Sequence, residues 1–147
     1  MKKIIYLLSF IALGIFASCE RDSANIEFLN TINIDGKWEV TAHNDTMAIS
    51  APFTVQTTSS KNSTLNDSLI IKDSKDEFWS FQVTAALNEE FGTFETELSP
   101  NEVCEERIGV KIFNGKIINN DSIYFEIQFE DDVKPYESTY ILKGHRK

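Results

Sequence analysis

The sequence predicts an all-β domain of about eight short antiparallel strands, and three observations support this. Along residues 122–130, apolar and polar side chains alternate strictly, so that Ile123, Phe125, Ile127 and Phe129 share one face. Such a period of two is typical of a strand with one buried face. Several other short segments alternate in the same way and are joined by turns of a few residues. From residue 36 onwards no segment has a helical period, which argues against βαβ units and a parallel sheet.

Residues 1–18 are predicted to be a cleaved lipoprotein signal peptide. A short basic start precedes an apolar run, residues 4–16, that is too short and wrongly flanked for a transmembrane span. The next sequence, Phe-Ala-Ser-Cys at 16–19, resembles the lipobox of bacterial lipoproteins, with Phe16 in place of the usual Leu. The resemblance implies cleavage before Cys19, a lipid on its thiol and anchoring to a membrane. The alternative is an ordinary signal peptide that leaves Cys19 as a free thiol.

Residues 19–35 are predicted to be a tether and lead-in, and residues 36–147 the folded domain. The tether begins with Glu-Arg-Asp at 20–22. This loosely resembles the acidic sorting segment of outer-membrane and surface lipoproteins in Bacteroidetes, although a plain polar tether fits equally well. The resemblance implies a location on the outer membrane of the cell envelope.

The charge of the chain restricts its partners. The formal net charge is −9, and removal of the two leader lysines makes the mature chain more acidic. Nucleic-acid binding through a basic surface is therefore not expected. An anionic membrane surface would also repel the domain, so a lipid anchor would have to supply the attachment.

The predicted strands follow one another from residue 36. The first runs over 36–42, with Trp38, Val40 and Ala42 on one face. Further strands are expected at 53–57, 68–72, 78–87 and 92–98, separated by a polar loop at 58–66 and by charged turns at 73–77 and 88–90. Alternation would place the following side chains on shared faces: Trp79, Phe81, Val83, Ala85 and Leu87 in the fourth strand, and Phe94 and Leu98 in the fifth.

Residues 108–145 hold the remaining strands. The pair Asn114-Gly115 predicts a hairpin turn, because a type I′ turn needs positive φ at both central positions. A polar break at 119–121 precedes the alternating segment 122–130, and an acidic turn precedes the last strand. The inward set of this region is expected to be Val110, Ile112, Ile123, Phe125, Ile127 and Phe129.

Eight antiparallel strands must also deal with their exposed edges. They can close into an up-and-down barrel or split into a sandwich, and the sequential hairpins favour the barrel. The interior of an eight-stranded barrel is filled by side chains or holds one small ligand. The eleven Phe and two Trp of the chain fit either a filled core or an apolar cavity. If there is a cavity, we expect it to be lined by Trp79, Phe81, Val83, Phe94, Val110, Ile112, Ile123, Phe125, Ile127 and Phe129.

Three blocks of the sequence together resemble the "lipid-binding putative hydrolase" lipoproteins of Bacteroidetes. The blocks are 78–83, 110–118, and 121–129 with 140–146, and the resemblance covers residues 36–147. It implies a calycin-like, that is lipocalin-like, β-barrel and a lipid ligand. The resemblance does not identify any catalytic residue for the hydrolase activity in the family's name.

The start of the first strand, Gly36-Lys37-Trp38, also resembles the Gly-x-Trp of lipocalins. In that family the Trp closes one end of the barrel and an Arg of the last strand stacks on it. Arg146 is placed to do the same here, with a cation–π contact worth about 0.5–2 kcal/mol. The alternative is a core Trp at the start of a strand and a frayed terminal Arg.

The sequence contains no complete catalytic or metal-binding motif. There is no Gly-x-Ser-x-Gly elbow. His43 and His145 would approach each other if the first and last strands pair, and with Asp35 or Asp45 and a serine they could build a triad. Such a set is available in most chains of this composition, so His145 is only a weak catalytic candidate. With two histidines and no paired ligand spacing, neither a metal site nor a cofactor is expected.

The predicted function is therefore that of a lipid-anchored cell-envelope protein. Its barrel would bind a small apolar or amphipathic ligand, such as a fatty acid or a bile-acid-like molecule. Two alternatives are also compatible with the sequence. One is a lipid or ester hydrolase, as the name of the resembled family suggests. The other is an accessory protein that presents a β-surface to another envelope protein.

Overall fold

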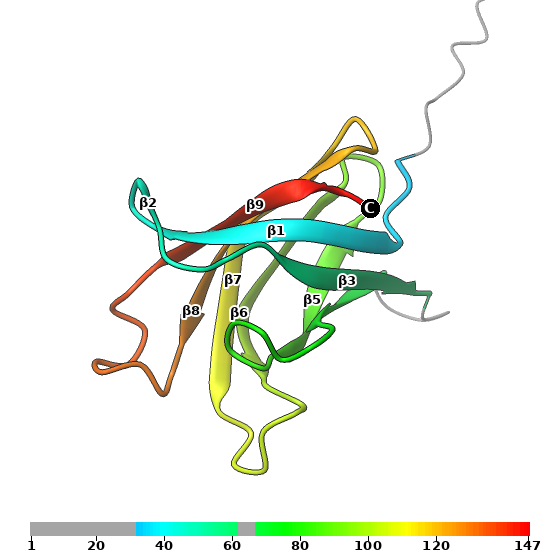
Figure 1. The fold of residues 1–147 in the computed structure, drawn as a ribbon. Coiled ribbons are helices and arrows are strands. Elements are labelled where there is room, and N and C mark those ends of the chain that lie inside the picture. Colours follow the sequence, from blue (N-terminus) through cyan, green and yellow to red (C-terminus); the bar gives the residue numbers. More distant parts are fainter. Residues whose placement is uncertain (1–31, 62–66) are drawn as a thin grey trace, which may run out of the picture. The chain divides into compact units, whose positions relative to one another are not determined.

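The computed structural model describes residues 32–61 and 67–147, which form a closed antiparallel β-barrel (Figure 1). The predicted signal peptide, Cys19 and most of the tether lie outside the described residues. The described part contains no helix that could cross a membrane. Its strands are β1 (Gly36–Asn44), β2 (Met47–Ala48), β3 (Phe53–Ser60), β4 (Ser68–Asp73), β5 (Gln82–Asn88), β6 (Thr93–Pro100), β7 (Gly109–Ile118), β8 (Ser122–Phe129) and β9 (Tyr140–Arg146).

Eight of the strands form the barrel wall in sequential order. Apart from the two-residue strand β2, which pairs only with the end of β1, each strand pairs with the next one along the chain. The barrel closes between β9 and β1, whose pairing runs from Trp38↔Arg146 to Asn44↔Tyr140. The predicted all-β fold and eight-stranded up-and-down barrel are thus confirmed, and the sandwich alternative is wrong.

Because successive strands run in opposite directions, the connections divide between two ends of the barrel. We call one end the base. It holds the lead-in 32–35, Arg146 at the end of β9, the paired ends of β3 and β4 at Ser60 and Ser68, and the β5–β6 and β7–β8 connections. We call the other end the mouth, and its four connections are 45–52, 74–81, 101–108 and 130–139. In Figure 1 the base lies near the label C, and three of the mouth loops extend at the bottom of the view.

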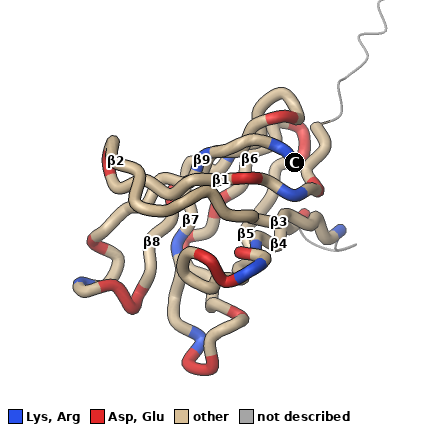
Figure 2. The backbone as a smooth tube through the Cα atoms, viewed as in Figure 1, with Lys and Arg blue, Asp and Glu red and all other residues tan. Residues whose placement is uncertain are grey.

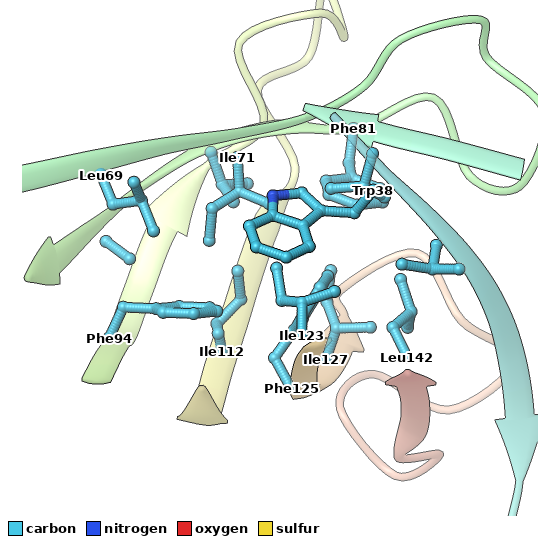
Figure 3. Close-up of a cluster of buried hydrophobic side chains, with 14 of the residues drawn as sticks. Trp38, Leu69, Ile71, Phe81, Phe94, Ile112, Ile123, Phe125, Ile127 and Leu142 are labelled. Carbon is cyan, nitrogen blue, oxygen red and sulfur yellow. The ribbon is translucent and has the colours of Figure 1, made fainter. Parts of the chain in front are cut away.

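The inner face of the wall is apolar and packed. Figure 3 shows side chains from β1, β4, β6, β7, β8 and β9 meeting around Trp38. The alternation predicted for 122–130 is confirmed, because each inward residue of β8 is at most 1 % exposed. On β1, Trp38, Val40 and Ala42 are each 0 % exposed, also as predicted. The inward positions of both strands are apolar because burying them removes large areas of hydrocarbon from water.

The predicted hairpin turn at Asn114-Gly115 is wrong, because this pair lies inside β7. The β7–β8 register shifts between Phe113 and Lys116, which marks a β-bulge. Asn114 does have positive φ, 54°, but the bulge requires it rather than a turn. The bulge reverses which residues face inward, so that Ile117 is buried although it was absent from the predicted inward set.

The turn between β7 and β8 lies instead at the polar break. Asn119 and Asn120 have φ of 50° and 60°, as the central residues of a type I′ turn require. The N–H of Asp121 donates to the carbonyl of Ile118 at 3.1 Å and closes this turn. Both Asn-Gly at 114–115 and Asn-Asn at 119–120 tolerate positive φ, so local sequence alone did not separate the turn from the bulge.

Three other predictions also differ from the structure: two boundaries and the facing of one side chain. The strand expected at 78–87 begins only at Gln82, and residues 78–81 belong to the mouth connection. On β6, register shifts turn Leu98 outward, where it is 61 % exposed, and bury Ser99 in its place. The loop expected at 58–66 starts later, because β3 continues to Ser60 in pairing with β4.

Candidate functional site: the two ends of the barrel

The base is held by Arg146, the last residue of β9. Its guanidinium carbon lies 4.1 Å from the ring centroid of Trp38. The guanidinium also donates to three main-chain carbonyls, those of Asp35 at 2.8 Å, Asn33 at 2.6 Å and Asn120 at 2.7 Å. One side chain thereby joins the lead-in, the β7–β8 turn and the first strand of the barrel.

Trp38 packs against this arginine from inside the barrel. The indole is 0 % exposed, and its Nε1 donates to the Thr57 hydroxyl at 2.8 Å. The same hydroxyl donates to the carbonyl of Ile34 at 2.6 Å, so no polar atom of this group is left unpaired. Ile34 is itself buried beneath the barrel. Together with Arg146, these contacts close the base.

The mouth is covered by Phe78 and Trp79, which we call the aromatic cap. Both residues come from the connection 74–81 rather than from the wall. Phe78 stacks on Phe53 with ring centroids 5.3 Å apart. Trp79 stacks almost parallel on Phe129 at 4.6 Å and lies 5.1 Å from Tyr140. The cap therefore rests on aromatic residues of β3, β8 and β9.

Two buried polar side chains hold the connection 74–81 in place. The carboxylate of Asp73, 0 % exposed, accepts the backbone N–H of Lys75 at 3.1 Å and of Phe78 at 2.8 Å. Asn101, also 0 % exposed, donates from Nδ2 to the Ser80 carbonyl at 3.2 Å. The folded position of the cap thus depends on a few hydrogen bonds at its two ends.

Acidic side chains surround the mouth. Its four connections hold ten acidic residues and three basic ones, and Figure 2 shows acidic segments in the loops at this end. Two carboxylates contact the aromatic residues directly. Asp131 accepts the indole N–H of Trp79 at 3.1 Å, and Asp132 accepts the hydroxyl of Tyr140 at 3.1 Å.

The ionisation of the mouth groups follows from these contacts. Hydrogen bonding from the Ser138 hydroxyl lowers the pKa of the Asp132 carboxyl; slight burial opposes this, and the Val133 N–H and the Tyr140 hydroxyl lower it further. Burial raises the pKa of the Tyr140 phenol, and the neighbouring Asp132 raises it too. At neutral pH Asp132 is therefore an anion and Tyr140 a neutral donor.

The predicted cavity-lining residues fall into two groups in the structure. Trp79 lies in the cap at the mouth. The other nine point into the barrel and are at most 2 % exposed: Phe81, Val83, Phe94, Val110, Ile112, Ile123, Phe125, Ile127 and Phe129. Sequence reasoning missed Phe53, Phe78 and Tyr140 as parts of the mouth. Only the order of aromatic residues next to loops could have indicated them.

A family model described as "Lipid-binding putative hydrolase" matches residues 23–147. The chain belongs to this family. The resemblance of the three sequence blocks is thus confirmed, and the closed barrel with an apolar inner face fits the lipid-binding part of the family's description. Among the curated proteins, no match to the chain was found.

For the hydrolase part of the family's description, the two histidines are the residues to consider. The first and last strands do pair, but His145 lies opposite Glu39 and His43 opposite Ile141. Four residues along a strand separate the two histidines by about 13 Å. In residues 32–61 and 67–147, neither histidine shares a hydrogen bond with a serine. The structure does not bring the proposed triad together.

A hollow lies on the wall of the barrel, away from the mouth. It is an open depression of about 520 Å³, lined by residues 86–88 of β5, 93–95 of β6 and 114–116 of β7. Phe94 is the one predicted cavity residue that lines it. The bulge of β7 shapes this part of the wall, since Gly115 leaves room for the Phe94 ring directly against the backbone.

Proposed function

We propose that the protein is a lipid-anchored cell-envelope protein whose barrel binds a small apolar or amphipathic, lipid-like ligand. The family's description and the closed barrel support this proposal. The observation that carries it is the inner face, on which every inward side chain of β8 is apolar and at most 1 % exposed. An apolar inner wall of this kind suits an alkyl chain and offers no polar partner to a charged group inside the barrel.

A ligand would enter this barrel through the mouth rather than through the base. At the base, the Arg146 side chain ties three main-chain carbonyls together, and opening it would break all three hydrogen bonds and the contact with Trp38. At the mouth, side chains of a single connection cover the interior. Because side chains now fill the interior, a ligand must displace some of them, and those of the connection are the least constrained.

Ligand binding is tested on a chain that begins at residue 20, which keeps every described strand and the β1–β9 closure. Titration with an environment-sensitive fluorescent fatty-acid probe is expected to show saturable binding at one site. An unlabelled lipid should displace the probe, because both compete for the same apolar interior. A probe signal that rises linearly without saturation would contradict the proposal.

Lipidation of Cys19 is tested separately, by mass spectrometry of the protein from a bacterial host that processes lipoproteins. The wild-type chain is expected to gain the mass of its acyl chains after cleavage before Cys19. Cys19→Ala should remain unmodified, whereas Cys104→Ala, which removes the other cysteine, should still gain the acyl mass. Acyl mass on the Cys19→Ala protein would show that the anchor assignment is wrong.

A further inference from the structure

The aromatic cap is held less firmly than the wall on which it rests. Phe78 and Trp79 are only half-buried, although the rings beneath them are buried. Within the same connection, Asp76 and Ser80 have φ of 57° and 46°, a backbone conformation that non-glycine residues seldom adopt. The hydroxyl oxygen of Ser74 is buried there without a hydrogen-bond partner. Opening the cap would relieve both of these costs.

Beneath the cap lies an aromatic floor that continues into the barrel. Phe53 and Phe129 are 3 % and 0 % exposed, and they are covered by Phe78 and Trp79 respectively. Phe129 in turn packs against Phe81, with ring centroids 6.2 Å apart, inside the wall. If the cap moves outward, an alkyl chain can replace its two rings on this floor and follow the apolar inner face.

The charge around the mouth selects the head group of such a molecule. Of the three basic residues in the mouth connections, Arg107 and Lys134 are paired with Glu102 at 3.7 Å and Glu137 at 2.9 Å. The excess of carboxylates leaves a negative field at the mouth, which attracts cations and repels anions. Carboxylates beside aromatic rings are also the combination that binds positively charged groups.

We propose that Phe78 and Trp79 form a movable cap, and that the mouth admits a single-chain amphiphile with a positively charged head group. Its alkyl chain replaces the cap rings against Phe53 and Phe129, and its head group lies beside Asp131 and the neighbouring Asp132. This inference rests on the proposed function, since it names the class of lipid-like ligand and its way into the same barrel. A free fatty acid should bind in the same barrel but more weakly than the cationic amphiphile, because its carboxylate meets repulsion at this mouth.

The test compares three amphiphiles with the same dodecyl chain, all below their micelle concentrations: dodecyltrimethylammonium, dodecyl maltoside and dodecyl sulfate. The chain from residue 20 carries 5-fluorotryptophan, so that Trp38 and Trp79 each give a ¹⁹F resonance, assigned with Trp79→Phe. The Trp79 resonance should shift in a saturable manner while that of Trp38 stays. The ammonium should bind about tenfold more tightly than the sulfate at low salt. The difference in affinity between the ammonium and the sulfate should decrease as added salt shortens the Debye length.

Two charge-neutralised variants locate the head group. Asp131→Asn with Asp132→Asn keeps an acceptor oxygen at both positions and should weaken ammonium binding about fivefold, with little change for the maltoside. The matched control, Glu89→Gln with Glu90→Gln, neutralises two adjacent carboxylates in the β5–β6 turn at the base. It should leave all three affinities unchanged. Equal effects of the two double variants would overturn the placement of the head group.

The remaining outcomes separate this inference from the proposed function. If the three amphiphiles bind equally and Trp79 moves, the charge selectivity is wrong but lipid binding stands. If they bind while the Trp79 resonance stays in place, the cap does not open, and the depression on β5–β7 becomes the site to examine. If neither the amphiphiles nor the fluorescent fatty acid bind, the proposed function itself fails.

Discussion

Replacing Trp38 by alanine is expected to lower the free energy of unfolding by about 3–5 kcal/mol. The indole is 0 % exposed at the base, so its removal leaves a cavity that the surrounding strands cannot fill. It also takes away the donor to the Thr57 hydroxyl and the ring beneath the Arg146 guanidinium. Urea unfolding followed by circular dichroism measures the loss as a lower midpoint with an unchanged slope.

The second tryptophan provides the control for this prediction. Trp79 is half-buried in the cap, and its indole N–H donates to the exposed carboxylate of Asp131. Trp79→Ala should therefore cost about 1–2 kcal/mol, within the range of ordinary substitutions. Trp38→Phe should fall between the two alanine variants, since it keeps most of the buried ring and loses the donor. Equal losses for Trp38→Ala and Trp79→Ala would contradict the view that packing at the base stabilises the barrel more than packing of the cap does.

The sequence predicted the wall well on strands that contain no bulge of their own. On β1 and β8, inward and outward residues alternate without interruption, because a strand places successive side chains on opposite faces. The buried set of β8 could therefore be named from the order of residues alone, and its bounds, Ser122–Phe129, agree closely with the alternating segment. Closure of the barrel followed from the short connections, which leave each strand next to its neighbour in sequence.

The failures came where the pairing is irregular. A bulge inserts one residue into one strand, and from that point the opposite set of residues faces inward. This happens on β7, where it buries Ile117, and on β6, where it exposes Leu98. Whether a strand bulges depends on its partner strand, so the order of residues in one strand does not reveal it. The Asn-Gly pair was misassigned for this reason.

The candidate site was predictable only in part for a similar reason. Alternation identified the inner wall but also placed Trp79 on it, because Trp79 and Phe81 are two residues apart. The positive φ of Ser80 breaks the strand between them and sends the indole over the mouth. That path is set by Asp73 and Asn101, buried side chains on β4 and beside β6 whose hydrogen bonds to the connection exist only in the folded barrel. The local order of residues does not predict such contacts.

Replacing Gly144 by alanine is expected to weaken the closure of the barrel and to cost about 3 kcal/mol of unfolding free energy. Gly144 on β9 pairs with both Val40 and Ile123. A Cβ at this position would collide with the carbonyl oxygen of Glu39 and lie 2.7 Å from the Cα of Val40. Both are backbone atoms of β1, so the β1–β9 pairing would have to separate. Hydrogen exchange should show faster opening of the β1 and β9 amides than of β4 and β5.

Gly36→Ala is the matched control, because it adds the same methyl group to β1 just beyond the Trp38↔Arg146 end of the β1–β9 pairing. There the new Cβ would meet the guanidinium of Arg146, whose central carbon lies 3.1 Å from the position. The tip of a long side chain can move aside, whereas a paired strand cannot, so Gly36→Ala should cost clearly less than Gly144→Ala. Equal costs would mean that β1 can shift to accept a methyl group. The closure would then owe its stability to the Arg146 contacts rather than to the close approach of the two backbones.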